Sequence, residues 1–172
     1  ARGTDNGLRP SRGMGGQRGN SMSGDRTNGA NGSAAEPDLR HGPLTGIKVV
    51  DLTVAIQGPH AAAYLVDMGA EVVKVERPGG GDVMRRTASG LRAFTALNAG
   101  KEIIECDLGT SEGLERVLAL ACEADVLVDN YRPGVPERIG IGEAQLREIN
   151  PRLVYVSISG FGEDGPLARE TA

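Results

Sequence analysis

Five short apolar segments alternate with helical segments in most of the chain, and this alternation limits the possible folds more than any other feature. The apolar segments lie at residues 47–52, 71–76, 101–107, 125–129 and 153–158. Short runs rich in Val and Ile, bounded by Gly, Pro or Asp, are typical of buried strands. Strands that alternate with helices imply β-α-β crossovers, and therefore a parallel sheet with helices on its faces. We predict an α/β fold.

The segments between these strands carry signals for helix ends. Gly58 and Pro59 begin a helix that stops at Gly69, and Thr110 or Ser111 caps a second helix that continues to residue 124. A third helix is predicted at residues 143–150. Residues 83–100 predict a short helix and a turn, and residues 131–142, which are rich in Gly and Pro, predict a loop.

The first 42 residues have a different composition from the rest. They are rich in Gly, Arg, Ser and Asn and have almost no large apolar residues, so we predict a disordered arm at 1–42 and a folded domain at 43–172. One interpretation of the arm is an RNA-binding segment. The alternative, an extension without a binding role, is favoured because the arm has no aromatic side chain that could stack on a base.

Charge and cysteine content exclude several classes of protein. The net charge of −4 gives no broad basic surface for a nucleic acid, and the chain has no run of about 18 apolar residues that would cross a membrane. Cys106 and Cys122 suit neither a disulfide framework nor a metal site, and His41 and His60 form no metal motif. We therefore expect a cytoplasmic protein with reduced thiols and no metal.

Polar residues follow the predicted strands, at the edge where parallel sheets bind ligands. The loops there lack G-x-G-x-x-G, G-x-x-x-x-G-K-[ST] and G-x-S-x-G, which argues against a dinucleotide fingerprint, a P-loop and a hydrolase elbow. They do contain Arg77, Arg132 and Arg138, whose guanidinium groups suit phosphate. Asn130 and Tyr131 add an amide and a ring. These residues indicate a ligand that bears a phosphate or a nucleotide.

Four linked motifs carry a resemblance to a known family. They are PLTGIKVVDLT…GP, LVDMGAEVVKVERPGGGD, ADVLVDNYRPGVPERIG and INPRLVYVSISGFGEDGP, and together they cover residues 43–166. Their order and spacing resemble the start of the class III CoA-transferases, the relatives of formyl-CoA transferase, carnitine CoA-transferase and α-methylacyl-CoA racemase. The resemblance implies a Rossmann-like sheet with helices on both faces, here as an incomplete large domain. It also implies an interlocked homodimer for the full-length chain.

The same resemblance implies a reaction and a coenzyme site. CoA would pass from an acyl-CoA donor to a carboxylic acid, with an aspartate carboxylate as the nucleophile. The positions that match the family's CoA site are Ala55, Ile56, Gln57, Arg77, Lys101, Asn130, Tyr131, Arg138 and Ile139. Formyl-CoA transferases carry Gln one position before Gln57, which weakens a substrate role for that residue. Glu102 also departs from the family, which usually has a basic residue after the lysine that Lys101 matches.

The nucleophilic aspartate of the family matches no residue of this sequence. We expect it beyond Ala172, so that this chain alone would be inactive. Three alternatives stay open at this stage. An acyl-CoA racemase of the same family would need a catalytic His, and His60 is not where that base is expected. The others are a CoA- or nucleotide-binding module without catalysis, and an RNA-binding protein that uses the arm.

Overall fold

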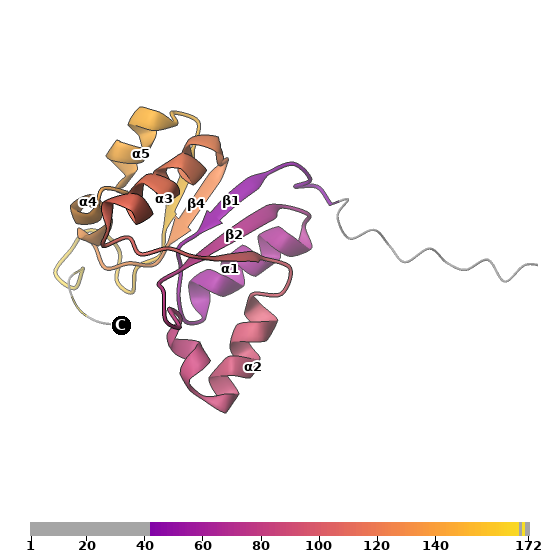
Figure 1. The fold of residues 1–172 in the computed structure, drawn as a ribbon. Helices are drawn as coiled ribbons and strands as arrows, with labels where there is room; N and C mark the ends of the chain where they lie inside the picture. The colour runs from indigo at the N-terminus through magenta and orange to yellow at the C-terminus, as the bar shows by residue number, and fades with distance from the viewer. Residues whose placement is uncertain (1–41, 169, 171–172) are drawn as a thin grey trace, which may run out of the picture. The chain divides into compact units, whose positions relative to one another are not determined.

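The computed structural model describes residues 42–168 and residue 170. Its centre is one sheet of five strands in the order β3-β2-β1-β4-β5, and every neighbouring pair is parallel (Figure 1). The strands are β1 (Lys48–Asp51), β2 (Glu71–Glu76), β3 (Glu102–Glu105), β4 (Val126–Asp129) and β5 (Val154–Ser157). This is the doubly wound order of Rossmann-like folds, in which the chain extends first to one side of β1 and then to the other. The predicted parallel α/β sheet is confirmed.

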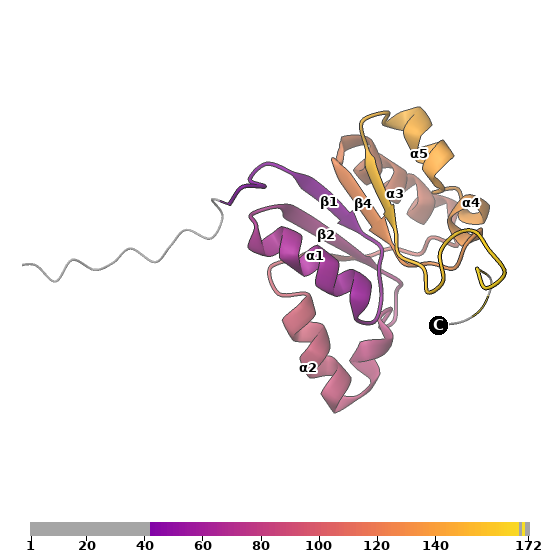
Figure 2. The same cartoon turned by 180° about the vertical axis from the view of Figure 1, so that it is seen from behind.

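Helices lie on both faces of this sheet, as predicted. They are α1 (Gln57–Asp67), α2 (Ala88–Leu97), α3 (Ser111–Glu123), α4 (Val135–Ile139) and α5 (Glu143–Ile149), with a 3₁₀ turn, η1 (Val83–Arg86), before α2. Helix α1 packs against one face, and α3, with α5 beside it, lies on the other (Figures 1 and 2). Right-handed crossovers produce this arrangement, because the direction of strand addition reverses between β3 and β4.

Helix α4 corrects one prediction, because it lies inside the segment 131–142 that the sequence predicted as a loop. Gly134 and Gly140 flank this single turn, and both have left-handed backbone conformations, with φ of 81° and 87°. Pro136 lies in the first turn, where its missing N–H is not needed. The Gly and Pro residues that suggested a loop therefore supply the start and the end of a short helix.

Successive residues of the strands point to opposite faces and build a separate core on each. On the α3 face the core includes Val50, Val117 and Leu127. On the α1 face it is smaller and includes Val49 and Val128. Parallel strands covered on both faces are expected to be almost continuously apolar, which explains the Val- and Ile-rich segments of the sequence.

The α1 face of the sheet is covered unevenly. Helix α1 lies over β1 and β2, whereas the same side of β5 carries no helix within the described residues (Figure 2). Val154 and Val156 pair with Val126 and Val128 of β4, and their exposed fractions are 54% and 36%. Strand β5 therefore presents Val154 and Val156 to solvent on this face.

Other sequence expectations concern single residues and the arm. Cys106 is buried and Cys122 is exposed on α3, and both are free thiols. No helix in residues 42–168 has both the length and the apolar content to span a bilayer. The predicted arm, and with it an RNA-binding role, lies outside the described residues apart from Gly42.

Candidate functional site

The crevice for a ligand in a doubly wound sheet lies where the strand order reverses, which here is between β1 and β4. An open cavity of about 470 Å³ occurs at this place, over the carboxyl ends of β1, β4 and β5. Its volume is within the usual range for small-molecule sites. The cavity is lined by Gln57, Asn130, Tyr131, Arg132, Pro133, Ile158, Ser159, Gly160, Ala168 and Glu170.

Three residues that the sequence predicted for the site meet in this cavity: Gln57, Asn130 and Tyr131. Asn130 also joins the two loops at the crevice. Its Nδ2 donates to the carbonyl oxygen of Val54 over 2.8 Å, and its Oδ1 accepts the Val54 N–H over 2.9 Å. The Asn130 amide therefore fixes the loop after β1 relative to the loop after β4.

Asp129, the last residue of β4, lies next to the cavity residues Asn130 and Tyr131 and influences the pKa of Tyr131. Its carboxyl is buried, and Oδ1 accepts the Tyr131 N–H over 3.0 Å. Burial raises the pKa of Asp129, and the neighbouring Tyr155 hydroxyl opposes this effect. Burial and the Asp129 charge raise the pKa of Tyr131. Tyr131 therefore keeps a neutral hydroxyl at physiological pH and can donate a hydrogen bond.

Other predicted residues lie away from the cavity. Arg77 is exposed in the loop after β2, and Arg138 is exposed on α4. Ile139 is partly buried against the core of the α3 face. Of the three arginines proposed for phosphate, only Arg132 lines the cavity. Within residues 42–168 and 170, none of the three guanidinium groups forms a hydrogen bond or an ion pair, so each is available to an anion.

Lys101 was predicted to contact CoA, but in the structure its ammonium is surrounded by groups of the domain itself. Its ammonium is fully buried and donates to Asp51 Oδ2, Asn98 Oδ1 and the carbonyl of Pro59, over 2.8, 2.9 and 2.9 Å. Burial lowers the pKa of Lys101, and the Asp51 charge opposes that effect. A contact between Lys101 and CoA stays a prediction, but the three donors of its ammonium are engaged inside the domain.

Glu76 ends β2 at the place where dinucleotide-binding folds hold an acid for a ribose. Here both of its carboxylate oxygens accept hydrogen bonds from Arg85, from Nε over 2.8 Å and from Nη2 over 2.9 Å. The Arg85 guanidinium also lies 3.8 Å from the centre of the Phe94 ring. Hydrogen bonding to Glu76 raises the pKa of Arg85. The Glu76 carboxylate thus anchors η1 and α2 to the sheet.

Ile158, Ser159 and Gly160 line the cavity, although no residue of the loop after β5 had been assigned from the sequence. The available signal was the position of this loop at the end of a predicted strand. A racemase would require a catalytic His, and His60, which the sequence did not place at that position, is exposed on α1 and stacks on Tyr64, with 4.8 Å between ring centres. It is not among the cavity residues.

No group of three or more His, Cys, Asp or Glu side chains in the described part of the chain could hold a metal ion.

Comparisons with known proteins agree with these observations. The model of CoA-transferase family III matches residues 44–172. The succinyl-CoA:mesaconate CoA-transferase of Haloarcula hispanica is 44% identical over 139 residues, which cover 76% of this chain and 34% of that protein. The formyl-CoA:oxalate CoA-transferase of Escherichia coli is 45% identical over 135 residues, with coverages of 76% and 32%.

The fold has a similar counterpart among solved structures. Rv3272 from Mycobacterium tuberculosis matches with a TM-score of 0.73 and 39% sequence identity, over 77% of this chain and 37% of that protein. The chain therefore spans about a third of the length of the curated relatives that it matches.

Proposed function

The chain belongs to CoA-transferase family III, and from this premise we propose that it forms the CoA-binding part of an enzyme that moves CoA from an acyl-CoA donor to a carboxylic acid. The observation that carries the proposal is the cavity at the reversal of the strand order, which contains Gln57, Asn130 and Tyr131. Both relatives described above are named for an acyl-CoA donor and a dicarboxylic acid, oxalate or mesaconate. A small carboxylic acid is accordingly the proposed acceptor.

The chemistry of the cavity walls supports CoA as the ligand. Arg132 offers a guanidinium with no partner among the described residues, which suits a phosphate of the nucleotide end. The Tyr131 ring and Ile158 offer apolar surface for the adenine or the pantetheine chain. In this proposal Arg77 and Arg138 are further candidates for the phosphates, because their guanidinium groups lie at the same edge of the sheet and have no partner in the part of the chain that the structure describes.

The proposed mechanism uses a carboxylate as the nucleophile. An aspartate attacks the thioester carbonyl and CoA thiolate leaves, so that one difficult transfer is divided into easier steps. The buried aspartates Asp51 and Asp82 hold backbone N–H groups inside the domain, which argues against either as this nucleophile. As the resemblance to the family implies, the proposal assigns that role to an aspartate that matches none of the described residues 42–168. The interlocked homodimer and the cytoplasmic location expected from the sequence are part of the same proposal.

Isothermal titration of the 172-residue chain with CoA tests the binding role. We expect saturable binding, and we expect Arg132→Ala to weaken it by about tenfold, because a charge-assisted contact to phosphate is lost. Arg152→Ala is the matched control, because Arg152 is exposed just before β5, at the opposite end of that strand from the cavity. The proposal would be wrong if CoA failed to bind, or if both variants bound it as well as the unmodified chain.

A further inference from the structure

The backbone of the loop after β1 is held by side chains from several parts of the fold. This holds for three consecutive residues, Thr53, Val54 and Ala55. The Thr53 N–H donates to Asp51 over 2.9 Å, the Thr53 carbonyl accepts from Lys74 over 2.7 Å, both groups of Val54 bond to Asn130, and the Ala55 N–H donates to Asp82 over 3.2 Å. Pairing of these five backbone groups fixes the path of a loop that regular secondary structure does not hold.

Ala55 has an unusual conformation within this loop. Its φ is 67°, and it is the single non-glycine residue with positive φ in the part of the chain that the structure describes. A side chain with Cβ is disfavoured in the left-handed region, and such a residue persists only where its surroundings over-determine it. The Ala55 N–H donates a hydrogen bond to Asp82 Oδ1.

Asp82 is fully buried, although it belongs to the glycine-rich segment RPGGGD, which predicts an exposed loop. Gly79 and Gly80 have φ of 81° and 91°, which lets the segment turn back toward the sheet. Asp82 Oδ1 accepts the N–H groups of both Ala55 and Met84, the latter over 2.9 Å as the cap of η1. The glycines thus place a carboxylate between two loops.

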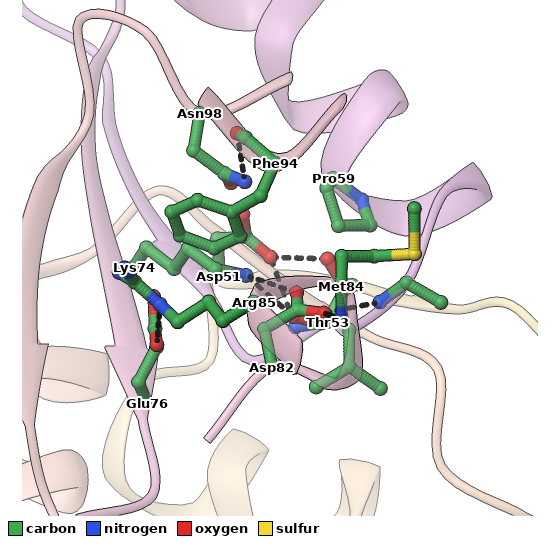
Figure 3. Close-up of polar contacts among 12 residues, drawn as sticks. Asp51, Thr53, Pro59, Lys74, Glu76, Asp82, Met84, Arg85, Phe94 and Asn98 are labelled. Atoms are coloured by element: carbon green, nitrogen blue, oxygen red, sulfur yellow. Dashed lines mark hydrogen bonds and ion pairs between the residues drawn. The ribbon is translucent and has the colours of Figure 1, made fainter. Parts of the chain in front are cut away.

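Lys74 completes this arrangement from the middle of the sheet. Its ammonium lies 3.7 Å from Asp82 Oδ2, and the side chains of both residues are fully buried (Figure 3). The same ammonium donates to the Thr53 carbonyl. One buried ion pair therefore holds both ends of the segment Thr53–Ala55, with Lys74 at the first residue and Asp82 at the last.

Two residues after Ala55 the chain reaches the candidate site at Gln57, whereas Ile56 is not among the residues that line the cavity. Ile56 is half exposed, and Gln57 begins α1 and lines the cavity. The direction of the chain into Gln57 depends on φ of Ala55, because a return to the ordinary negative φ would redirect the next peptide. The position of Gln57 in the cavity is thus coupled to the hydrogen bond between Ala55 and Asp82.

We propose that Asp82 is a positioning residue of the coenzyme site: by holding the Ala55 N–H, it keeps the loop after β1 and the start of α1 in the conformation that receives CoA. This inference rests on the proposed function. Asp82 does not touch the ligand in this account. It acts through Ala55, and the charge of Lys74 keeps it in place.

The test compares two substitutions that remove the same charge. Asp82→Asn keeps an oxygen that can accept from Ala55 and Met84, whereas Asp82→Ala removes it. Both leave Lys74 buried without its counter-ion, so both should lower the melting temperature. Isothermal titration with CoA separates them: we expect Asp82→Ala to weaken binding by about tenfold or more, and Asp82→Asn by less than about threefold. Equal affinities for the two variants would overturn the proposal.

Two controls keep the result specific. Val117→Ala lowers stability by opening a cavity in the core of the α3 face, and it should leave the affinity for CoA unchanged. If Asp82→Ala does not fold, Asp82→Ser replaces it, because serine can still cap η1 but its shorter side chain withdraws the acceptor from Ala55. Wild-type affinity for CoA in a folded Asp82→Ser variant would contradict the proposal.

The amide resonance of Ala55 makes it possible to distinguish a failure of the positioning role from a failure of the proposed CoA binding. We expect Asp82→Ala to shift the Ala55 amide proton upfield, because its acceptor is lost, and Asp82→Asn to leave the proton near its original position. If the unmodified chain does not bind CoA, the proposed function fails, while this shift still tests the hydrogen bond. If the chain binds CoA but the Ala55 amide is unchanged in Asp82→Ala, the positioning role is wrong.

Discussion

The two halves of the sheet differ most at their carboxyl ends. Beyond β1 and β2, four charged side chains are buried in the pairs Lys74–Asp82 and Lys101–Asp51. Beyond β4 and β5 there is an open cavity, where Arg132 has no partner among the described residues. Strand β5 also exposes Val154 and Val156. The first half is therefore distinguished by buried ion pairs, and the second half by the open cavity and exposed apolar side chains.

This difference assigns separate tasks to two sets of charged residues. Buried ion pairs contribute little net stability, because desolvation offsets most of their attraction, but the loss of one partner is costly and they can fix the geometry of the groups that they join. The buried pairs beside β1 therefore serve as a frame for the loop that leads into α1. The unpaired Arg132 is free to contact a ligand. Substitutions on the two sides should accordingly change different quantities.

The largest effect is expected for Lys101→Met. This change leaves the Asp51 carboxylate buried without its cation and removes hydrogen bonds to Asn98 and to the Pro59 carbonyl. We expect the free energy of unfolding to fall by about 3–5 kcal/mol, the usual cost of an uncompensated buried charge. Urea denaturation at pH 7 measures it. A loss below about 1 kcal/mol would show that this half of the sheet is not held by its buried pairs.

Asn130→Ala tests the link between the two halves. The substitution removes both hydrogen bonds to Val54, and we expect the free energy of unfolding to fall by about 1–3 kcal/mol. CoA affinity should fall as well, because the loop after β1 is released. Asn130→Asp keeps an acceptor for the Val54 N–H but puts a negatively charged oxygen opposite the Val54 carbonyl, so it should lower stability as well. Unchanged CoA affinity in Asn130→Ala would show that the loop after β1 does not influence CoA binding.

Asp129→Asn is expected to change how stability depends on pH. Because burial raises the pKa of Asp129 above its ordinary value of 3.8, the native carboxyl keeps a proton that the unfolded chain has already lost. The native state binds more protons in the window between the two pKa values, so stability falls as the pH rises through it. Asp129→Asn removes the titrating carboxyl, so this pH-dependent loss of stability should disappear. Urea denaturation from acidic to neutral pH compares the two proteins, and identical slopes would contradict the assignment.

The smallest effect is expected for Lys48→Met. The ion pair between Lys48 and Glu123 spans 3.1 Å, but their side chains are 52% and 76% exposed. Water and salt screen such a pair, so we expect a change below about 1 kcal/mol. The same denaturation experiment measures it beside Lys101→Met. A loss as large as that of Lys101→Met would remove the distinction between buried and exposed pairs.

Local patterns were sufficient to predict the strands, because burial on both faces of a parallel sheet favours Val-rich segments such as those of β2 and β4. Helix α4 was missed, because Gly134 and Pro136 signal both loops and the ends of short helices. Periodicity also placed Asn130 and Tyr131 correctly at the carboxyl edge of the sheet.

The role of Asp82 could not be predicted from the sequence, because its partner Ala55 lies 27 positions away and meets it only in the folded chain. The same holds for Lys101, whose pairing with Asp51 spans 50 positions. A charged residue beside glycines has the local sequence of an exposed loop, and tertiary contacts alone decide whether it is buried.

The most direct test of the central claim is amide NMR of the 172-residue chain during titration with CoA. The account predicts that shifted resonances gather at the carboxyl edge of the sheet, at Gln57, Asn130, Tyr131 and residues 158–160. A second hollow, of about 370 Å³, lies at the opposite edge and is lined by Lys48, Glu71, Arg116 and Leu120 among others. Shifts that gather there, or an absence of shifts at saturating CoA, would contradict the account.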